Sequence, residues 1–303
     1  MKSFKGRTAV ITGAASMPKP EACRIAAREG MNVVMADVQA DALERAAAEI
    51  RGLSAEVLPF RLDVSQAHEM EALGEATAAR FGTPHFVFNN AGVGVGGLIW
   101  EHSAHDWAWI LGVNVMGVAH GVRVFTPPML AAAQADPDYE GHIVNTASMA
   151  GLLNPPNLGA YNVSKHAVVS LSETLYQDLA LVTEQVTASV LCPYFVPTSI
   201  HQSHRNRPVE DGAAGAKPTR SQRVAQAMTG KAVESGKISA ANVAALVFDA
   251  LRERRFYIYS HPKALAAVQT RLEDVMLARN PTDPFIGKPE LGAELRAALR
   301  AGA

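Results

Sequence analysis

The chain has 303 residues, of which 48% are hydrophobic and 19% charged, with a formal net charge of −1. A chain of this length and composition can bury one large core, and its near-neutral charge gives no electrostatic footprint for nucleic acid or for an anionic membrane. Residues 1–10 lack an apolar signal core, and no stretch reaches about 18 apolar residues. We therefore expect a cytoplasmic protein with neither nucleic acid nor a membrane as a partner.

The N-terminal part of the chain alternates short apolar strands with helical stretches. Residues 8–13 predict a strand that ends in glycine, a helical pattern runs on to Gly30, and residues 32–37 predict a second strand. The same rhythm is repeated around residues 56–62 and 85–88. Strands that alternate with helices form a parallel sheet covered by helices on both faces. We predict an α/β fold in three layers: a single domain built on a doubly wound, Rossmann-like parallel sheet.

The second predicted strand ends in an acid, Asp37. An acid at this point of a βαβ unit is placed to hydrogen-bond the adenosine ribose hydroxyls of a dinucleotide and to repel a 2′-phosphate. Asp37 therefore favours NAD over NADP as the cofactor.

A proton-transfer site is indicated by a tyrosine and a lysine four residues apart. Tyr161 and Lys165 belong to a helical pattern over residues 159–181, so both side chains leave the same helix face. Lowering the pKa of a tyrosine by ~3 units needs ~4 kcal/mol of preferential stabilisation of the phenolate, and the Lys165 ammonium can supply much of it. Tyr161 would protonate a ketone oxygen as hydride arrives, or deprotonate an alcohol, while the hydroxyl of Ser148 holds that oxygen. The alternative is an ordinary helical Tyr/Lys pair.

The C-terminal third of the chain reads as a lid and an extension. Residues 199–239 are polar and contain Gly, Ala and Pro, which predicts a mobile lid over the active site. We place a catalytic domain at residues 1–260, including this lid, and a C-terminal helical extension at residues 261–303. Within these ranges the pattern predicts a helix over residues 240–252, a last strand over 256–259 and a helix over 262–279, before a Pro-rich tail.

Basic side chains gather at the start of the lid. This cluster could bind an acidic substrate, or it could be a solvated loop face; it consists of His201, His204, Arg205 and Arg207. The two histidines have no further ligands in their segment, so no metal site is expected. The two cysteines, Cys23 and Cys192, lie in predicted buried elements without metal-ligand spacing, which indicates reduced core thiols.

Taken together, these motifs resemble the short-chain dehydrogenase/reductase family from about residue 4 to about residue 198. The resemblance implies a catalytic tetrad of Asn114, Ser148, Tyr161 and Lys165. It also implies that Lys165 holds the nicotinamide ribose and that Asn114 anchors a water that relays protons to solvent.

The resemblance further implies the residues that contact the cofactor. The segment 89–92 would support the sheet beside the cofactor, Asp63 would contact adenine, and Thr198 would touch the carboxamide. The full set of expected contacts is Gly13, Ser16, Met17, Asp37, Asp63, Val64, Asn90, Ala91, Gly92, Tyr161, Lys165, Pro193, Val196 and Thr198.

The phosphate loop departs from the family pattern. The family has T-G-x-x-x-G-x-G, whereas Met17 and Lys19 stand here at the second and third glycines, each followed by a proline. The missing glycines normally let the backbone approach the pyrophosphate and let the helix pack closely on the strand. Since a residue before proline avoids the α region, the helix should begin near Pro20 or Glu21, displaced from the pyrophosphate.

Three interpretations of the loop remain open. In the first, the loop is tolerated and the Lys19 ammonium compensates for lost backbone donors. In the second, the loop has been deliberately rebuilt, which would weaken NAD binding or redirect the enzyme to another hydride carrier. In the third, the protein binds a ligand on a dehydrogenase fold without turnover, although an intact tetrad speaks against this. A second departure is Tyr194, which follows Pro193 where the family has Gly and so can reshape the nicotinamide face.

The sequence also predicts features of the substrate pocket and of the subunit contacts. Residues 93–100 and 149–156 are mostly apolar and should rise from the carboxyl ends of strands, where ligands bind in such folds. We therefore expect an NAD-preferring dehydrogenase or reductase that acts on a hydrophobic secondary alcohol or ketone. By resemblance, the helices around residues 107–129 and 161–181 pair subunits in a homodimer or homotetramer. The sequence fixes neither the physiological substrate nor the direction of the reaction.

Overall fold

The described residues form a parallel sheet in which the strand order reverses beside the first strand. The computed structural model describes residues 1–15, 20–208 and 217–300. All strand pairs are parallel and the order is β3-β2-β1-β4-β5-β6-β7. The strands are β1 (Thr8–Thr12), β2 (Asn32–Asp37), β3 (Val57–Arg61), β4 (Phe86–Asn89), β5 (Gly141–Thr146), β6 (Val186–Cys192) and β7 (Tyr257–Tyr259).

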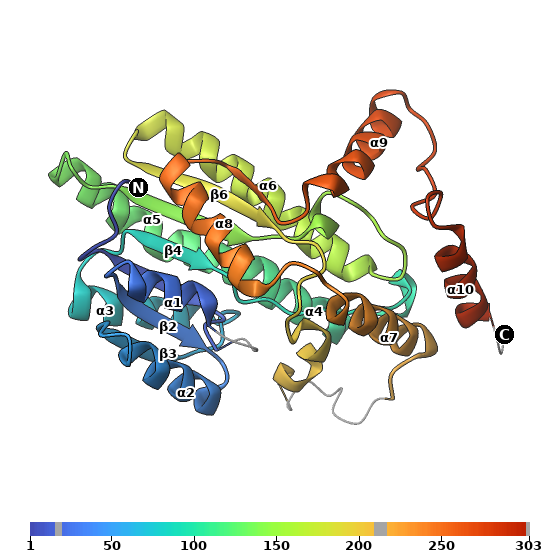
Figure 1. Cartoon of the computed structure of the whole chain (residues 1–303), viewed down its shortest axis with the longest axis horizontal. Helices are drawn as coiled ribbons and strands as arrows, with labels where there is room; N and C mark the ends of the chain where they lie inside the picture. The colour runs from blue at the N-terminus through green and yellow to red at the C-terminus, as the bar shows by residue number, and fades with distance from the viewer. Residues whose placement is uncertain (16–19, 209–216, 301–303) are drawn as a thin grey trace.

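Helices cover both faces of this sheet, as predicted (Figure 1). Successive strand residues point to opposite faces, so Ala9 and Ile11 of β1 join one core while Val10 joins the other. The first core is closed by α1 (Glu21–Arg28), α2 (Ala40–Arg51) and α8 (Ala240–Glu253). The second is closed by α3 (Ala67–Phe81), α5 (Gly117–Ala135) and α6 (Gly159–Val182). The predicted three-layer α/β fold is confirmed.

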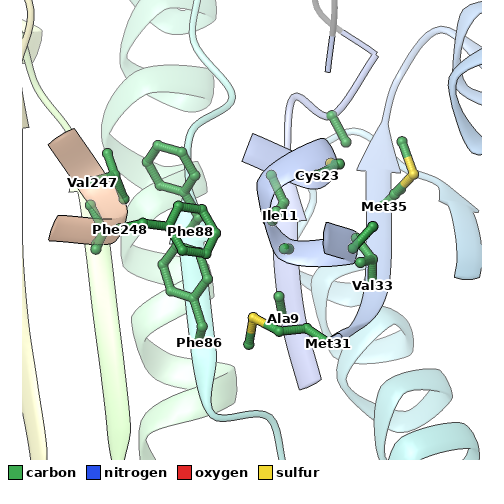
Figure 2. Close-up of a cluster of buried hydrophobic side chains, with 14 of the residues drawn as sticks. Ala9, Ile11, Cys23, Met31, Val33, Met35, Phe86, Phe88, Val247 and Phe248 are labelled. Atoms are coloured by element: carbon green, nitrogen blue, oxygen red, sulfur yellow. The ribbon is translucent and has the colours of Figure 1, made fainter. Parts of the chain in front are cut away.

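Aromatic side chains tie the C-terminal helix α8 to the centre of the sheet. Figure 2 shows Phe86 and Phe88 of β4 beside Phe248 of α8, with ring centroids of Phe86 and Phe248 5.6 Å apart. Full burial of such a side chain contributes about 1.5–3 kcal/mol, so this contact anchors residues of the C-terminal third to the N-terminal half. Cys23 lies in the same core, and both it and Cys192 are free and buried, as expected.

A continuous helix behind the sheet is longer and more apolar than expected. Residues 104–135 combine α4 (Ala104–Leu111), the π-helical turn η2 (Gly112–Met116) and α5, with a mean hydropathy of 1.4 over the most apolar window. By length and composition alone this helix is long and apolar enough to cross a membrane, a test that the core helix of a soluble protein also passes. Half of that window is buried, because residues such as Phe125 and Met129 pack in the second core.

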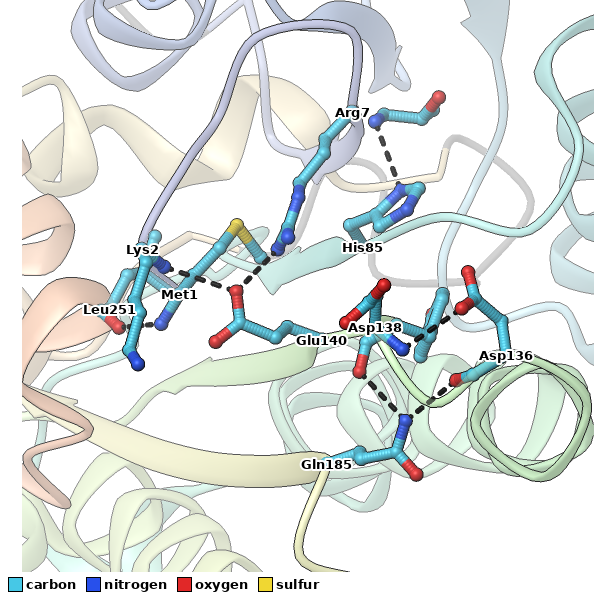
Figure 3. A network of polar contacts seen from close by, with 11 residues as sticks. Met1, Lys2, Arg7, His85, Asp136, Asp138, Glu140, Gln185 and Leu251 are labelled. Carbon is cyan, nitrogen blue, oxygen red and sulfur yellow. Dashed lines mark hydrogen bonds and ion pairs between the residues drawn. The ribbon is translucent and has the colours of Figure 1, made fainter.

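Polar side chains at the amino ends of the strands pair with one another (Figure 3). Glu140 accepts a hydrogen bond from the backbone N–H of Lys2 and forms an ion pair with Arg7 at 2.9 Å. Nearby, the amide of Gln185 donates to the backbone carbonyl of Asp136. These contacts fix the closed end of the sheet, opposite the strand ends that hold the predicted site.

The lid region contains more helix than the sequence indicated. A mobile lid was predicted over residues 199–239 without any helix being assigned to it, and the structure has the short helix η4 (Ile200–Asn206) and α7 (Arg220–Glu234) there. The reason for α7 is a capping box, in which the Thr219 hydroxyl accepts from the backbone N–H of Gln222 and the Gln222 side chain accepts from that of Thr219. The segment predicted as a lid therefore contains helices that the sequence analysis did not assign.

The C-terminal extension adds helices beyond the last strand. After β7 come the short turn η5 (Pro262–Ala264), then α9 (Leu265–Met276) and α10 (Pro289–Arg300). Figure 1 shows α9 and α10 projecting away from the sheet. The helix predicted over residues 262–279 is thus present, and the Pro-rich tail itself contains a further helix. Two short turns, η1 (Ile99–Glu101) and η3 (Met149–Gly151), follow β4 and β5.

Candidate active site

A cleft of about 2400 Å³ opens at the carboxyl ends of the strands. In open α/β sheets, ligands bind at this edge where the strand order reverses, here between β1 and β4. The cleft brings together many of the predicted site residues. Those that line it are Gly13, Asn90, Gly92, Ser148, Tyr161, Lys165, Pro193, Val196 and Thr198.

Other predicted residues lie behind the cleft wall or outside the described residues. The side chains that do not line the cleft are those of Asp37, Asp63, Val64, Ala91 and Asn114. Ser16 and Met17, with Pro18 and Lys19, fall in the part of the phosphate loop that lies outside the described residues. Helix α1 begins at Glu21 after Pro20, as the proline pattern predicted.

A close backbone crossing joins the ends of β1 and β4. Gly13 has φ +66°, and a Cβ there would stand 2.9 Å from the Cα of Ala91. The Thr12 hydroxyl accepts hydrogen bonds from the backbone N–H groups of Asn90 and Ala91, at 3.0 and 3.1 Å. Glycine is needed at position 13 because both its backbone conformation and the space exclude a side chain.

Asn114 is buried in the π-helical turn η2. Its amide Oδ1 accepts from the backbone N–H of Val93 at 2.8 Å, and its Nδ2 donates to the carbonyl of Val93 and to the Ser164 hydroxyl. Single π-turns inside α-helices are frequent at functional sites. The contacts shown here give Asn114 the role of fixing the loop after β4 to the helix that carries Tyr161.

Lys165 is buried under the cleft with its ammonium aimed at the end of β5. Its Nζ donates to the backbone carbonyl of Thr146 at 2.9 Å, and the Thr146 hydroxyl donates to Asn90 Oδ1 at 3.3 Å. Burial lowers the pKa of Lys165 to about 8, because a charged group loses solvation there. The ammonium has three N–H donors and one acceptor among the described residues, so it retains hydrogen-bonding capacity toward the cleft.

Tyr161 and Ser148 both line the cleft, and the pKa of Tyr161 differs from the expectation. Burial raises the pKa of Tyr161, and a hydrogen bond with Ser148 works in the opposite direction. The Lys165 Nζ lies 5.7 Å from the centroid of the Tyr161 ring. The expected lowering of the Tyr161 pKa is therefore corrected: burial is the dominant cause and raises this pKa, so the phenol is protonated at neutral pH.

Two carboxylates stand at the ends of β2 and β3, oriented by backbone N–H groups. Asp37 is buried, and its Oδ2 and Oδ1 accept from Ala15 at 2.9 Å and from Gln39 at 3.0 Å. Burial raises the pKa of Asp37 although these backbone donors oppose the effect. Asp63 Oδ1 accepts from the backbone N–H of Ser65 at 2.9 Å. A carboxylate oxygen can accept two hydrogen bonds, so both acids keep capacity for a further donor.

The lid segment η4 rests on the cofactor-side loops, which the sequence did not predict. The Ser203 hydroxyl accepts from the backbone N–H of Gly94 at 3.0 Å, and Gln39 donates to Asn206 Oδ1 at 2.7 Å. Farther along, Arg207 pairs with the Asp106 carboxylate of α4 at 2.6 Å. The lid is thus tied to the ends of β2 and β4 and to α4.

Apolar side chains form much of the remaining cleft wall. They come from the segments after β4 and β5 and from α4, and they include Val95, Trp109, Met149, Leu153, Pro155 and Leu158. Tyr194, at 45% exposure, stands at the cleft with its ring against Phe195 and His261. Of the segments expected to be apolar pocket walls, most of 149–156 lines the cleft, whereas only residues 94–96 of the segment 93–100 do so.

The sequence carries a signal for part of what was missed. Ser103 and Asp106 form a capping box at the start of α4, and Thr219 with Gln222 forms another at α7; both match the pattern S/T-x-x-D/E/Q. Reading them would have predicted these helix starts. The contact of Arg207 with Asp106 spans 101 residues of sequence and leaves no local signal.

Comparisons with known proteins agree with this geometry. The model of the family described as short chain dehydrogenase matches residues 7–208. A curated relative, a CLA biosynthesis dehydrogenase/reductase of Lactiplantibacillus plantarum, is 30% identical over 91% of this chain and 95% of its own length. A 1-deoxy-11-beta-hydroxypentalenate dehydrogenase of Streptomyces exfoliatus is 32% identical over 89% of this chain and 88% of its own.

A solved structure is more similar still. It is a short chain dehydrogenase/reductase from Burkholderia phymatum in complex with NAD, 54% identical, with a TM-score of 0.89 over 94% of this chain and 99% of that one.

Proposed function

Since the chain belongs to the short-chain dehydrogenase family and is therefore an oxidoreductase, we propose that it transfers hydride between NAD and a hydrophobic secondary alcohol or ketone. The observation that carries this proposal is the joint presence of Tyr161, Ser148 and Lys165 in one largely apolar cleft. A phenol, a hydroxyl and an ammonium gathered in this way serve to donate a proton, hold an oxygen and stabilise charge.

The residues present fit a nicotinamide dinucleotide. Gly13 and Gly92 leave bare backbone in the cleft wall, which allows the close approach that a dinucleotide needs. Lys165 has donors to spare for ribose hydroxyls. When bound, the nicotinamide ring supplies the acceptor or donor of hydride.

The chain's own residues would handle the proton. Because burial raises the pKa of Tyr161, its phenol carries a proton at neutral pH and can give it to a ketone oxygen. Ser148 would donate to the same oxygen. Oxidation of an alcohol requires the deprotonated phenol, so its rate should rise with pH, whereas the rate of ketone reduction should fall.

Asp37 supports a preference for NAD over NADP. It is fixed at the end of β2 by backbone donors from Ala15 and Gln39, and an anion at this place repels a 2′-phosphate. The similar protein from Burkholderia phymatum was solved with NAD, which favours the same choice here.

The apolar wall supports the proposed substrate class. One relative, by its name, acts on a hydroxypentalenate, which is consistent with a hydroxyl-bearing substrate. We further propose a cytoplasmic homodimer or homotetramer, with α4, α5 and α6 in the subunit contacts; light scattering of the purified protein tests the oligomeric state, and fractionation of cells tests the location.

A substrate screen with a matched pair of variants tests the function. Wild-type protein should form NADH from NAD and one or more hydrophobic secondary alcohols. Tyr161→Phe should lower kcat/KM by about 10²–10⁴ because it removes the proton donor. Tyr176→Phe is the control, since Tyr176 lies on the same helix but packs on Phe256 away from the cleft. Equal activity of wild type and Tyr161→Phe would contradict the proposal, and NADH binding without turnover would favour a binding protein.

A further inference from the structure

Arg207, which directly follows η4, contacts two side chains of α4. Its Nη1 donates to Asp106 Oδ1 at 2.6 Å, and its guanidinium lies 5.3 Å from the ring centroid of Trp109. The other oxygen of Asp106 accepts from the backbone N–H and the hydroxyl of Ser103, both at 2.9 Å. The ion pair and the aromatic ring therefore fix the plane of the guanidinium.

The opposite edge of this guanidinium is unused. Nε and Nη2 of Arg207 are both buried and have no hydrogen-bond partner among the residues that the structure describes. These two nitrogens form one edge of the planar group, which matches a carboxylate or phosphate in two parallel hydrogen bonds. A buried donor left without an acceptor costs about 1–3 kcal/mol. A ligand group that accepts from these two nitrogens would remove this cost.

Arg207 lines the same cleft as the proposed catalytic residues. Arg207, Trp109 and Tyr161 all line it, and Trp109 packs in the cluster of buried side chains that Tyr161 also contacts. Arg205 and Lys217 line the cleft from the lid as well.

A purely structural ion pair does not account for the geometry. Arginine and aspartate that only stabilise each other can use two parallel hydrogen bonds, yet here Asp106 takes a single nitrogen and spends its second oxygen on Ser103. Asp106 orients the arginine and leaves its two-nitrogen edge available.

We propose that the Nε–Nη2 edge of Arg207 binds a carboxylate or phosphate group of the molecule held in the cleft. This inference rests on the proposed function, because that function supplies the two sources of such a group: an acidic substrate, or the phosphates of the dinucleotide. In either case Arg207 is the residue that binds the anion.

Binding measurements separate the two sources without requiring turnover. The probes are NADH, followed by nicotinamide fluorescence, and the ketone pair para-acetylbenzoate and its methyl ester, followed by the shift in melting temperature with NADH present. The variants are Arg207→Gln, which removes the guanidinium group, and Arg207→Lys, which keeps the positive charge and the ion pair with Asp106. Arg223→Gln is the control, since Arg223 is an exposed arginine of α7 outside the cleft.

Two outcomes support the proposal and assign the source. If the anion is on the substrate, Arg207→Gln weakens para-acetylbenzoate at least about ten-fold and leaves the ester and NADH unchanged. If the anion is a cofactor phosphate, Arg207→Gln raises the NADH Kd at least about ten-fold, and its effects on the affinities for para-acetylbenzoate and for the methyl ester are equal. Arg207→Lys should lose most of the same affinity because it lacks the planar fork.

The proposal is overturned if both Arg207 variants fold and bind all three probes within two-fold of wild type, or if Arg223→Gln has the same effect as Arg207→Gln. It is also overturned if wild type binds none of the probes. The proposed function fails on a different observation, namely that a protein which binds NADH transfers no hydride to any ketone.

Discussion

The two edges of the sheet use their polar groups in opposite ways. At the amino ends of the strands, Glu140 is shared between Arg7 and the backbone of Lys2, and Gln185 is bonded to backbone carbonyls (Figure 3). At the carboxyl ends, Lys165 has one acceptor and Arg207 leaves two buried nitrogens without partners among the described residues. Glu140 and Gln185 at the amino edge are thus used by partners within the protein, whereas Lys165 and Arg207 at the carboxyl edge keep hydrogen-bonding capacity in reserve.

This difference indicates where the protein gives up stability for function. A buried lysine or an unpaired guanidinium edge lowers the stability of the folded chain, and such groups are retained where a ligand completes their hydrogen bonds. The amino edge can be altered at the cost of stability alone, whereas a change at the carboxyl edge should alter ligand binding as well.

The largest expected effect concerns the buried Lys165. Burial lowers its pKa from the ordinary lysine value of 10.5 to about 8 in the folded protein, so between these values the unfolded chain binds more protons and stability rises with pH. The gain in unfolding free energy from pH 8 to 10.5 should be about 3 kcal/mol. Urea unfolding at several pH values should show this slope in wild type and not in Lys165→Met.

Lys5→Met provides the control for that experiment. Lys5 is exposed near the amino edge, so the variant should keep the wild-type slope because Lys165 remains. An identical pH slope in wild type and Lys165→Met would show that burial of the Lys165 ammonium does not lower the stability of the folded protein.

A pair of glycines sharpens the comparison. Gly13 at the carboxyl edge and Gly6 at the amino edge both have positive φ, of +66° and +77°. Gly6→Ala meets no atom within 4 Å and should cost about 1–2 kcal/mol for its backbone alone. Gly13→Ala also drives a Cβ against Ala91 and should cost about 3 kcal/mol, and only it should weaken NADH binding.

Thermal unfolding and an NADH titration of both glycine variants check this. Equal loss of stability in the two variants, with unchanged NADH affinity for each, would show that the close contact of Gly13 with Ala91 requires no glycine and plays no part in NADH binding.

The smallest effect is expected at Glu140. Its partner Arg7 and Glu140 itself are 18% and 24% exposed as side chains, so Glu140→Gln should lower the free energy of unfolding by up to about 1 kcal/mol and leave the NADH Kd unchanged. Glu56→Gln, which breaks a more exposed pair with Arg80, should cost less. A change of more than two-fold in the NADH Kd of Glu140→Gln would contradict the claim that residues at the amino edge affect stability alone.

Much of the fold could be predicted because it is encoded locally. The apolar runs of β1 and β2 and the spacing of Tyr161 and Lys165 are short-range patterns, and Pro20 set the start of α1 as expected. The position of Ser148, Tyr161 and Lys165 in one cleft followed from the resemblance to a family with a known arrangement.

The rest depends on contacts between distant parts of the chain. The pKa of Tyr161 is raised because other segments bury it, which its neighbours in sequence do not reveal. The docking of Asn206 on Gln39 joins residues 167 positions apart, and no periodicity encodes such a contact. The helix α7 is an intermediate case, since its capping box at Thr219 was legible and was outweighed by the polar composition of the region.

The most direct test of the account is a titration of the purified protein with NADH and, separately, with NADPH, followed by nicotinamide fluorescence and by the melting temperature. If the carboxyl edge holds a dinucleotide through Lys165, Gly13 and Asp37, NADH should bind saturably and more tightly than NADPH. A concentration of NADH 100 times its Kd should then stabilise the fold by about 2.7 kcal/mol. Binding of neither dinucleotide, or tighter binding of NADPH, would contradict the account.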